Sequence, residues 1–133
     1  ADSGYKPYAT TITVQQSLID ANPDLVQRFV DASIEGWYNY LYGDNAAANA
    51  LIKTTNPEMT DGQIAYAIDK MKQYGIVDSG DALDKGIGCL TAERYKQLAD
   101  ELVKVKLLKA DTDYAKAFDT RFSCKGVGLN LKK

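Results

Sequence analysis

The side chains that most often carry out chemistry in proteins are scarce in this chain of 133 residues. It contains no histidine and only two cysteines, Cys89 and Cys124. Without histidine the chain cannot form a Ser-His-Asp or Cys-His catalytic site, an HExxH metalloprotease motif or a histidine-ligated metal centre. The cysteines do not form a Cys-x-x-Cys pair, which removes the usual zinc and redox spacings. One disulfide or two thiols remain.

Three aspartates in a glycine-rich segment could supply oxygen ligands to a cation. Asp78, Asp81 and Asp84 lack the alternating D-x-D-x-D-G order and the terminal glutamate of an EF-hand loop. We therefore interpret them as a solvated acidic loop. The nearby Gly86-Ile-Gly88 could bring backbone amides to an anion, but a single GxG without a strong preceding strand or a third glycine favours turn geometry.

The overall charge gives no reason to expect a polyanionic partner. The chain has 18 acidic and 16 basic residues, a net charge of -2 and a pI near 5.1, so no global basic field exists to attract nucleic acid or an anionic membrane. One helix has a basic margin, formed by Arg94, Lys96, Lys104, Lys106 and Lys109. Acidic neighbours dilute this margin and no aromatic platform is interleaved with it, so we interpret it as a solvated face.

Aromatic side chains are the remaining candidates for binding, because they combine apolar area with a polar tip. Trp37 and Tyr40 fall on the apolar half of a predicted helix, which favours a packing role for both. Tyr5 and Tyr8 flank a predicted strand outside any helix. A role in a ligand cleft and a role in packing both remain open for these two tyrosines.

The rest of the sequence pattern predicts mainly helices. Residues 8–14 alternate between two faces and are rich in β-branched side chains, which predicts one strand. After a helical turn, Asn22 and Pro23 are the cap and first residue of a long helix that ends at Gly43. The strand has no evident partner in the chain, although backbone groups of a strand need one.

Cap residues mark the later helices. They predict a helix from Asn45 to about Thr54 capped by Asp44, a helix opened by the capping box Thr60-Asp-Gly-Gln63 and ended by Gly75, a helix capped by Thr91, and another that begins near Asp113. The segment from Ile76 to Leu90 is predicted to be a structured connection. No linker or repeat divides the chain, so residues 1–133 are expected to form a single unit, mainly α with one or two strands.

Several stretches together resemble one protein family. They are Gly4-Tyr-Lys-Pro-Tyr-Ala-Thr-Thr-Ile12, Asn22-Pro-Asp-Leu-Val-Gln-Arg-Phe-Val-Asp-Ala-Ser33, Gly36-Trp-Tyr38, Asn56-Pro-Glu-Met59, and Gly86-Ile-Gly88 with Arg94. Over residues 5–129 the chain resembles the nitrate/sulfonate/taurine-type solute-binding proteins of ABC importers. The fold of that family is shared with a eukaryotic enzyme that makes the thiamine pyrimidine precursor.

The resemblance implies a two-lobe α/β periplasmic-binding-protein fold (type II), of which this chain is similar to the C-terminal portion. Residues 1–14 would then be the strand that crosses the hinge, and residues 15–133 the helical C-terminal part of the first lobe. The N-terminal half of the same protein, or a second copy of the chain, would supply the strand's partner. Tyr5, Tyr8 and Thr10 would lie where the hinge meets the cleft, as candidate ligand contacts or as structural hinge residues.

The function that the resemblance implies is that of a receptor. It would bind a small polar or anionic solute, such as a sulfonate, nitrate or a thiamine precursor, and present it to an ABC permease in the membrane. No enzymatic activity, cofactor or metal is expected. The implied location is periplasmic or extracellular, with association to a membrane through a partner as a further option. In that oxidising setting Cys89 and Cys124 are expected to form a disulfide.

Two other hypotheses stay open. An enzyme of the thiamine pyrimidine precursor synthase type would use the same fold, but it needs histidine and metal chemistry that this chain does not offer. A non-catalytic structural domain could dimerise by pairing its unpartnered strands.

Overall fold

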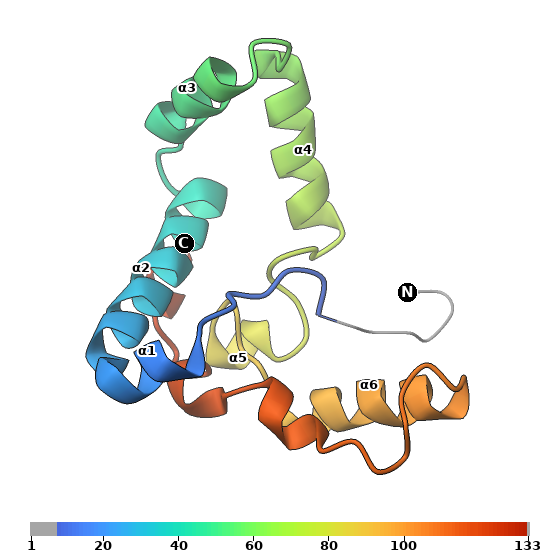
Figure 1. Cartoon of the computed structure of the whole chain (residues 1–133). Helices are drawn as coiled ribbons and strands as arrows, with labels where there is room; N and C mark the ends of the chain where they lie inside the picture. The colour runs from blue at the N-terminus through green and yellow to red at the C-terminus, as the bar shows by residue number, and fades with distance from the viewer. Residues whose placement is uncertain (1–7, 133) are drawn as a thin grey trace.

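A computed structural model describes residues 8–132, and this part of the chain is mainly helical, as predicted. Its α-helices are α1 (Gln16–Ala21), α2 (Pro23–Tyr42), α3 (Ala46–Thr55), α4 (Asp61–Gln73), α5 (Ala82–Lys85) and α6 (Ala92–Lys104), and three 3-10 turns follow, η1 (Tyr114–Ala117), η2 (Thr120–Phe122) and η3 (Leu129–Leu131). Figure 1 shows an open arrangement in which α3 and α4 extend from one end of α2, while α6 projects from the other side.

The strand predicted over residues 8–14 is wrong. Within the described range this segment is irregular and leads into α1. A strand is stable only when a neighbouring strand satisfies its backbone groups, and no strand lies anywhere between residues 8 and 132. The β-branched residues of this segment therefore form no strand despite their propensity, and the side chain of Tyr8 holds the segment to the rest of the chain.

Helix α2 is the central element, and its start is fixed by local chemistry. The side chain of Asn22 accepts a hydrogen bond from the amide of Leu25 at 3.1 Å, and Pro23 occupies the first helical position, as predicted. The core lies along one side of α2, where Ile34, Tyr38, Leu41 and Ile87 are buried, and Val30, Tyr40, Tyr42, Met71, Val77, Val127 and Leu129 pack against them. The C-terminal segment thus covers the buried side of α2, through Val127 and Leu129.

Tyr38 is the most deeply buried large side chain of the described residues, with no exposed surface. Its hydroxyl accepts a hydrogen bond from the amide of Ile87 at 3.2 Å. At Gly128, which has φ of 75°, a Cβ atom would lie 2.4 Å from a ring carbon of Tyr38, so only glycine fits there. Trp37, expected to pack, is instead 41% exposed, with its ring edge-on to Tyr40 at 6.1 Å.

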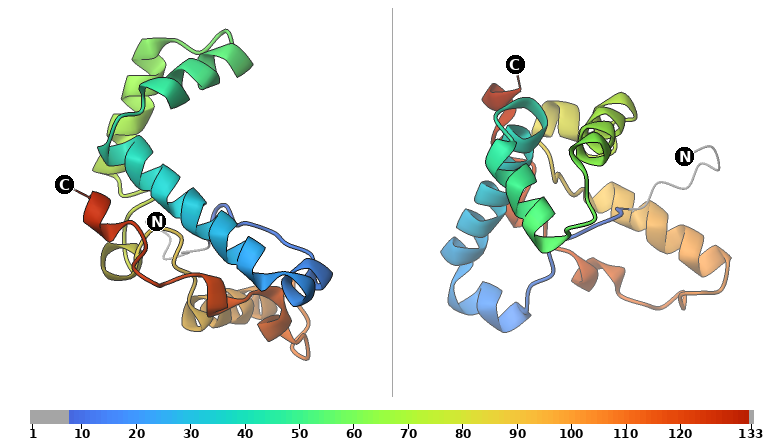
Figure 2. Two further views of the ribbon diagram at one scale, coloured as in Figure 1. Left: turned by 90° about the vertical axis from the view of Figure 1, so that its left-hand side faces the viewer. Right: turned by 90° about the horizontal axis from the view of Figure 1, so that it is seen from above.

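Helices α3 and α4 form an arm that reaches away from the core (Figures 1 and 2). The capping box predicted for α4 is confirmed, because the Thr60 hydroxyl accepts from the amide of Gln63 and the Gln63 side chain accepts from the amide of Thr60 at 2.8 Å. Ile64 is buried, whereas no residue of α3 is. The arm is therefore held by local signals more than by packing.

The last third of the chain contains α6 and the 3-10 turns. Thr91 caps α6 by accepting from the amide of Arg94 at 3.3 Å, as predicted. The helix expected near Asp113 is present only as the short turn η1. From there the chain runs back under α2, where Gln27 donates a hydrogen bond to the carbonyl of Phe122 at 3.1 Å.

Candidate functional site

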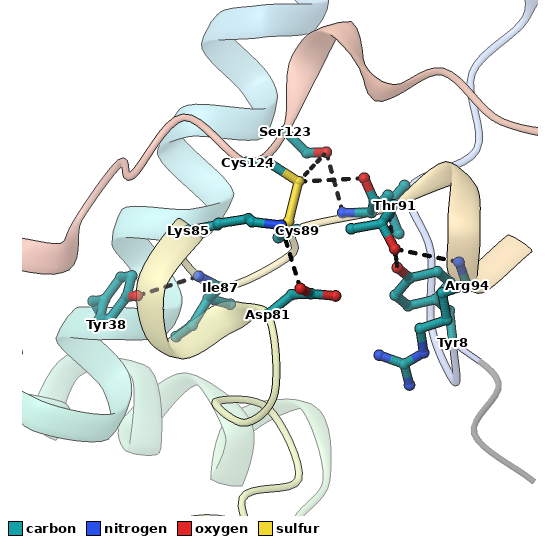
Figure 3. Close-up of a disulfide and its surroundings, with 11 residues drawn as sticks. Tyr8, Tyr38, Asp81, Lys85, Ile87, Cys89, Thr91, Arg94, Ser123 and Cys124 are labelled. Atoms are coloured by element: carbon teal, nitrogen blue, oxygen red, sulfur yellow. Dashed lines mark hydrogen bonds and ion pairs between the residues drawn. A yellow bond between two sulfur atoms is a disulfide. The ribbon is translucent and has the colours of Figure 1, made fainter.

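The first residue of interest, Tyr8, docks on the N-terminal end of α6 (Figure 3). The amide of Thr91 donates a hydrogen bond to the Tyr8 hydroxyl at 2.8 Å. The guanidinium of Arg94 lies 4.2 Å from the centre of the Tyr8 ring, a distance typical of a cation–π contact. Two contacts from one helical turn thus hold Tyr8, across a sequence separation of 83 residues.

An aromatic cluster continues from Tyr8. Its ring lies 5.3 Å from that of Tyr95, and the Tyr95 ring stacks on Phe118 at 4.3 Å. Burial raises the pKa of Tyr95 above its ordinary value, and the neighbouring Tyr8 adds to the shift. The cluster joins the N-terminal segment, α6 and the segment after η1 into one packed unit.

A disulfide lies next to this cluster. Cys89 and Cys124 are bonded, which confirms the predicted pairing. On either side of it, the Ser123 hydroxyl accepts from the amide of Leu90 at 3.2 Å, and the amide of Gly126 donates to the carbonyl of Lys85 at 3.0 Å. The bond therefore ties the segment that leads into α6 to the C-terminal segment that covers Tyr38 (Figure 3).

The three candidate ligand contacts have different positions. Tyr5 lies outside the described residues, and Thr10 is exposed. Tyr8 is the one that the structure places among other side chains, and its hydroxyl already accepts from a backbone amide. No pattern near Tyr8 indicates its partners Thr91 and Arg94, although Thr91 is a predicted cap and the amide of an N-cap residue needs an acceptor. The ligand roles of Tyr5, Tyr8 and Thr10 stay a prediction.

The predicted acidic loop is only partly solvated, and Asp78 corrects that interpretation. The Asp78 side chain is 4% exposed and its Oδ2 lies 2.7 Å from Lys132 Nζ. Tyr42 donates a hydrogen bond to the same oxygen at 2.6 Å. Burial, followed by this hydrogen bond, raises the pKa of Tyr42 to about 12. Because an unpaired buried carboxylate is unstable, Asp78 serves as an anchor for the C-terminal segment.

The two glycines and the other two aspartates fit the turn and loop interpretation. Gly86 and Gly88 have φ of 96° and 78°, the positive values that turns require of glycine. Asp84 is exposed, and Asp81 lies 3.4 Å from Lys85. Between residues 8 and 132 no group of three or more carboxylates or thiols is close enough to hold a metal ion.

A groove of about 420 Å³ lies between α3 and α4. It is lined by Asn45, Asn49, Asp61, Ile64, Ala65, Ile68, Asp69 and Lys72. The Oδ1 atom of Asn49 is buried without a hydrogen-bond partner among the described residues. The groove therefore has an unused acceptor, but it is open to solvent and does not enclose a molecule.

None of the helices between residues 8 and 132 combines the length and apolar character needed to cross a bilayer. Comparison of the chain with known protein families, curated proteins and solved structures finds no match.

Proposed function

We propose that this chain is the helical C-terminal part of the solute-binding component of an ABC importer, with no enzymatic activity of its own. In this proposal the receptor binds a small polar or anionic solute, such as a sulfonate, nitrate or a thiamine precursor, and delivers it to a membrane permease. The observation that carries the proposal is the apolar character of α2 on more than one side.

One side of α2 is buried by the chain itself, through Ile34, Tyr38 and Leu41. Outside this stripe Phe29 is 60% exposed, and Leu25 is 42% exposed. A helix that is apolar well beyond its buried stripe is typical of a helix covered by a second layer. In a two-lobe α/β receptor that layer is the sheet of the first lobe, which would cover this side of α2.

The open groove of this chain also fits a solute site that is shared with a further lobe. The space between α3 and α4 is open, whereas binding sites for small molecules bury 70–90% of the ligand as a general rule. In the proposal, therefore, the solute is enclosed between this chain and a further lobe, with Tyr5, Tyr8 and Thr10 at the hinge. The disulfide suits a periplasmic or extracellular location, because disulfides persist in oxidising compartments.

The experiment that tests solute binding is calorimetry on the product of the full coding region. Taurine, nitrate, bicarbonate and a thiamine pyrimidine precursor are titrated separately. We expect saturable heat with one of them and a matching rise in melting temperature. If all four leave both the heat and the melting temperature unchanged, the receptor proposal fails.

A second experiment tests the covered face of α2. Phe29→Asp should lower the melting temperature of the full product more than that of the 133-residue chain, because the charge would be buried only where a second layer is present. Glu35→Asp, at an exposed position of the same helix, is the matched control and should change neither. Equal effects of Phe29→Asp on the two proteins would contradict the layered arrangement.

A further inference from the structure

The C-terminal end of α6 combines exposed apolar side chains with lysines. Val105 is 58% exposed and Leu107 is 78% exposed, and Lys104, Lys106 and Lys109 around them are exposed as well. We call residues 104–109 the basic tip. Figure 1 shows that α6 projects away from the core, so the tip stands at a margin of the molecule.

The geometry of the tip is that of a Schellman motif, the common way to end a helix. The amide of Leu107 donates to the carbonyl of Leu102 at 2.8 Å, and the amide of Lys106 donates to the carbonyl of Val103 at 2.9 Å. In this motif the residue at the position of Leu107 usually packs back on the helix. Here its side chain is directed to solvent instead, as its exposure shows.

Lys106 occupies the position in this motif that glycine normally fills. Its φ is 61°, in the left-handed region that side chains other than glycine rarely adopt. A residue in this region persists only where the surrounding structure fixes it, and glycine would end the helix at lower cost. Compared with glycine, Lys106 therefore costs stability at this position and adds an exposed charge.

The local charge is opposite to that of the chain. Residues 104–109 contain three lysines and no acidic residue, while the whole chain has a net charge of -2. Glu101 lies 3.7 Å from Lys104, but both side chains are more than half exposed, so solvent screens this pair. The tip therefore complements an anionic surface, although the molecule as a whole does not.

We propose that the basic tip docks on the surface of an anionic lipid bilayer. Val105 and Leu107 enter the headgroup region, and the three lysines contact the anionic headgroups. A tip of six residues with two exposed apolar side chains is far smaller than a protein interface, which takes about 20–30 residues from each partner. Peripheral membrane binding, in contrast, combines a few inserted side chains with juxtaposed lysines. The inference is independent of the proposed solute.

The test is co-sedimentation of the 133-residue chain with vesicles. Phosphatidylcholine vesicles with and without phosphatidylglycerol are compared at low and high salt. We expect binding to the anionic vesicles that decreases with salt, because salt screens the lysines. Leu107→Ser should lower the partition coefficient about ten-fold through lost apolar burial, and Lys106→Gly about five-fold through the lost charge.

The matched control is Ile76→Ser. Ile76 holds the same motif position at the end of α4 and is 65% exposed, but it lies outside the basic tip, so its variant should bind like the parent. Equal binding to both kinds of vesicle, or an unchanged Leu107→Ser, would overturn the proposal. A concentration-dependent dimer that Leu107→Ser abolishes, with no vesicle binding by the parent, would assign the tip to contacts between copies and would overturn it too.

Discussion

Helices α4 and α6 are built to the same plan by different means. Each has 13 residues, follows a capping threonine and carries an acidic residue in its first turn. Each ends in a Schellman motif, at Gly75 in α4 and at Lys106 in α6. The two helices nevertheless differ in which residues supply the hydrogen-bond acceptors for the backbone amides at their ends.

At the N-terminal end the difference is between a local and a distant acceptor. In α4 the amide of the capping residue Thr60 donates to the side chain of Gln63, three residues away. In α6 the residue at the corresponding position is Arg94, whose guanidinium is a donor and cannot accept a hydrogen bond from the amide of Thr91. That amide donates to the hydroxyl of Tyr8 instead. Helix α6 is therefore complete only when the chain has folded around it, whereas α4 carries its own caps.

The largest expected effect comes from removing the long-range support of α6. Replacing both cysteines, Cys89→Ala with Cys124→Ala, should lower the free energy of unfolding by about 3–4 kcal/mol, because the bond closes a loop of 35 residues. Urea denaturation measures this loss. Hydrogen exchange should show that amides at the start of α6 lose more protection than those of α4. Equal losses in the two helices would remove the proposed distinction.

The next effect is at the C-terminal end of α4. Gly75→Ala should destabilise the protein by about 2 kcal/mol, because φ is 56° and the new Cβ would lie 2.8 Å from the Cβ of Ser79. Lys106→Ala, at the equivalent position of α6, is the control and should stay within about 0.5 kcal/mol of the parent, since lysine already has a Cβ. Thermal unfolding of both variants decides whether the two ends differ in this way.

A smaller effect is expected from the distant acceptor. Tyr8→Phe keeps the ring but leaves the partly buried amide of Thr91 without its acceptor, at a cost of about 1 kcal/mol. Gln63→Ala should cost less, because the amide of Thr60 is exposed and water replaces the lost acceptor. Chemical denaturation of both variants gives the comparison, and a larger loss for Gln63→Ala would reverse our interpretation.

The smallest effect has the opposite sign. Lys106→Gly should stabilise the protein by about 0.5–1 kcal/mol, because glycine adopts φ near 60° without steric conflict. The midpoint of urea unfolding should rise accordingly. A lower midpoint would mean that Lys106 makes stabilising contacts and that lysine at this φ does not cost stability relative to glycine.

The same contrast explains how much could be predicted from the sequence. The helix starts at Pro23 and Asp61 and the left-handed glycine at Gly75 follow from signals within a few residues. The cap of α6 was equally visible at Thr91. The disulfide was expected only through a family resemblance, because the spacing of two cysteines says nothing about their distance in space.

The failures concern residues whose environment comes from distant parts of the chain. Residues 8–14 have strand propensity but no neighbouring strand within the described residues. The sequence favours a packing role for Trp37, yet Trp37 is 41% exposed and its neighbour Tyr38 is the side chain that the C-terminal segment buries completely. Asp78 was expected in water and instead binds Lys132, more than 50 residues away. Groups of this kind are placed by tertiary contacts, which no local pattern records.

The burial of Tyr38 has a consequence for the order in which the protein is made. Its closest partners, Ile87 and Gly128, are about 50 and about 90 residues further along the chain. At synthesis rates of roughly 5–20 residues per second, α2 must wait about 5–20 s before the segment that covers it exists. During that time the side of α2 that carries Tyr38 is an apolar surface on a growing chain, which no later segment yet covers.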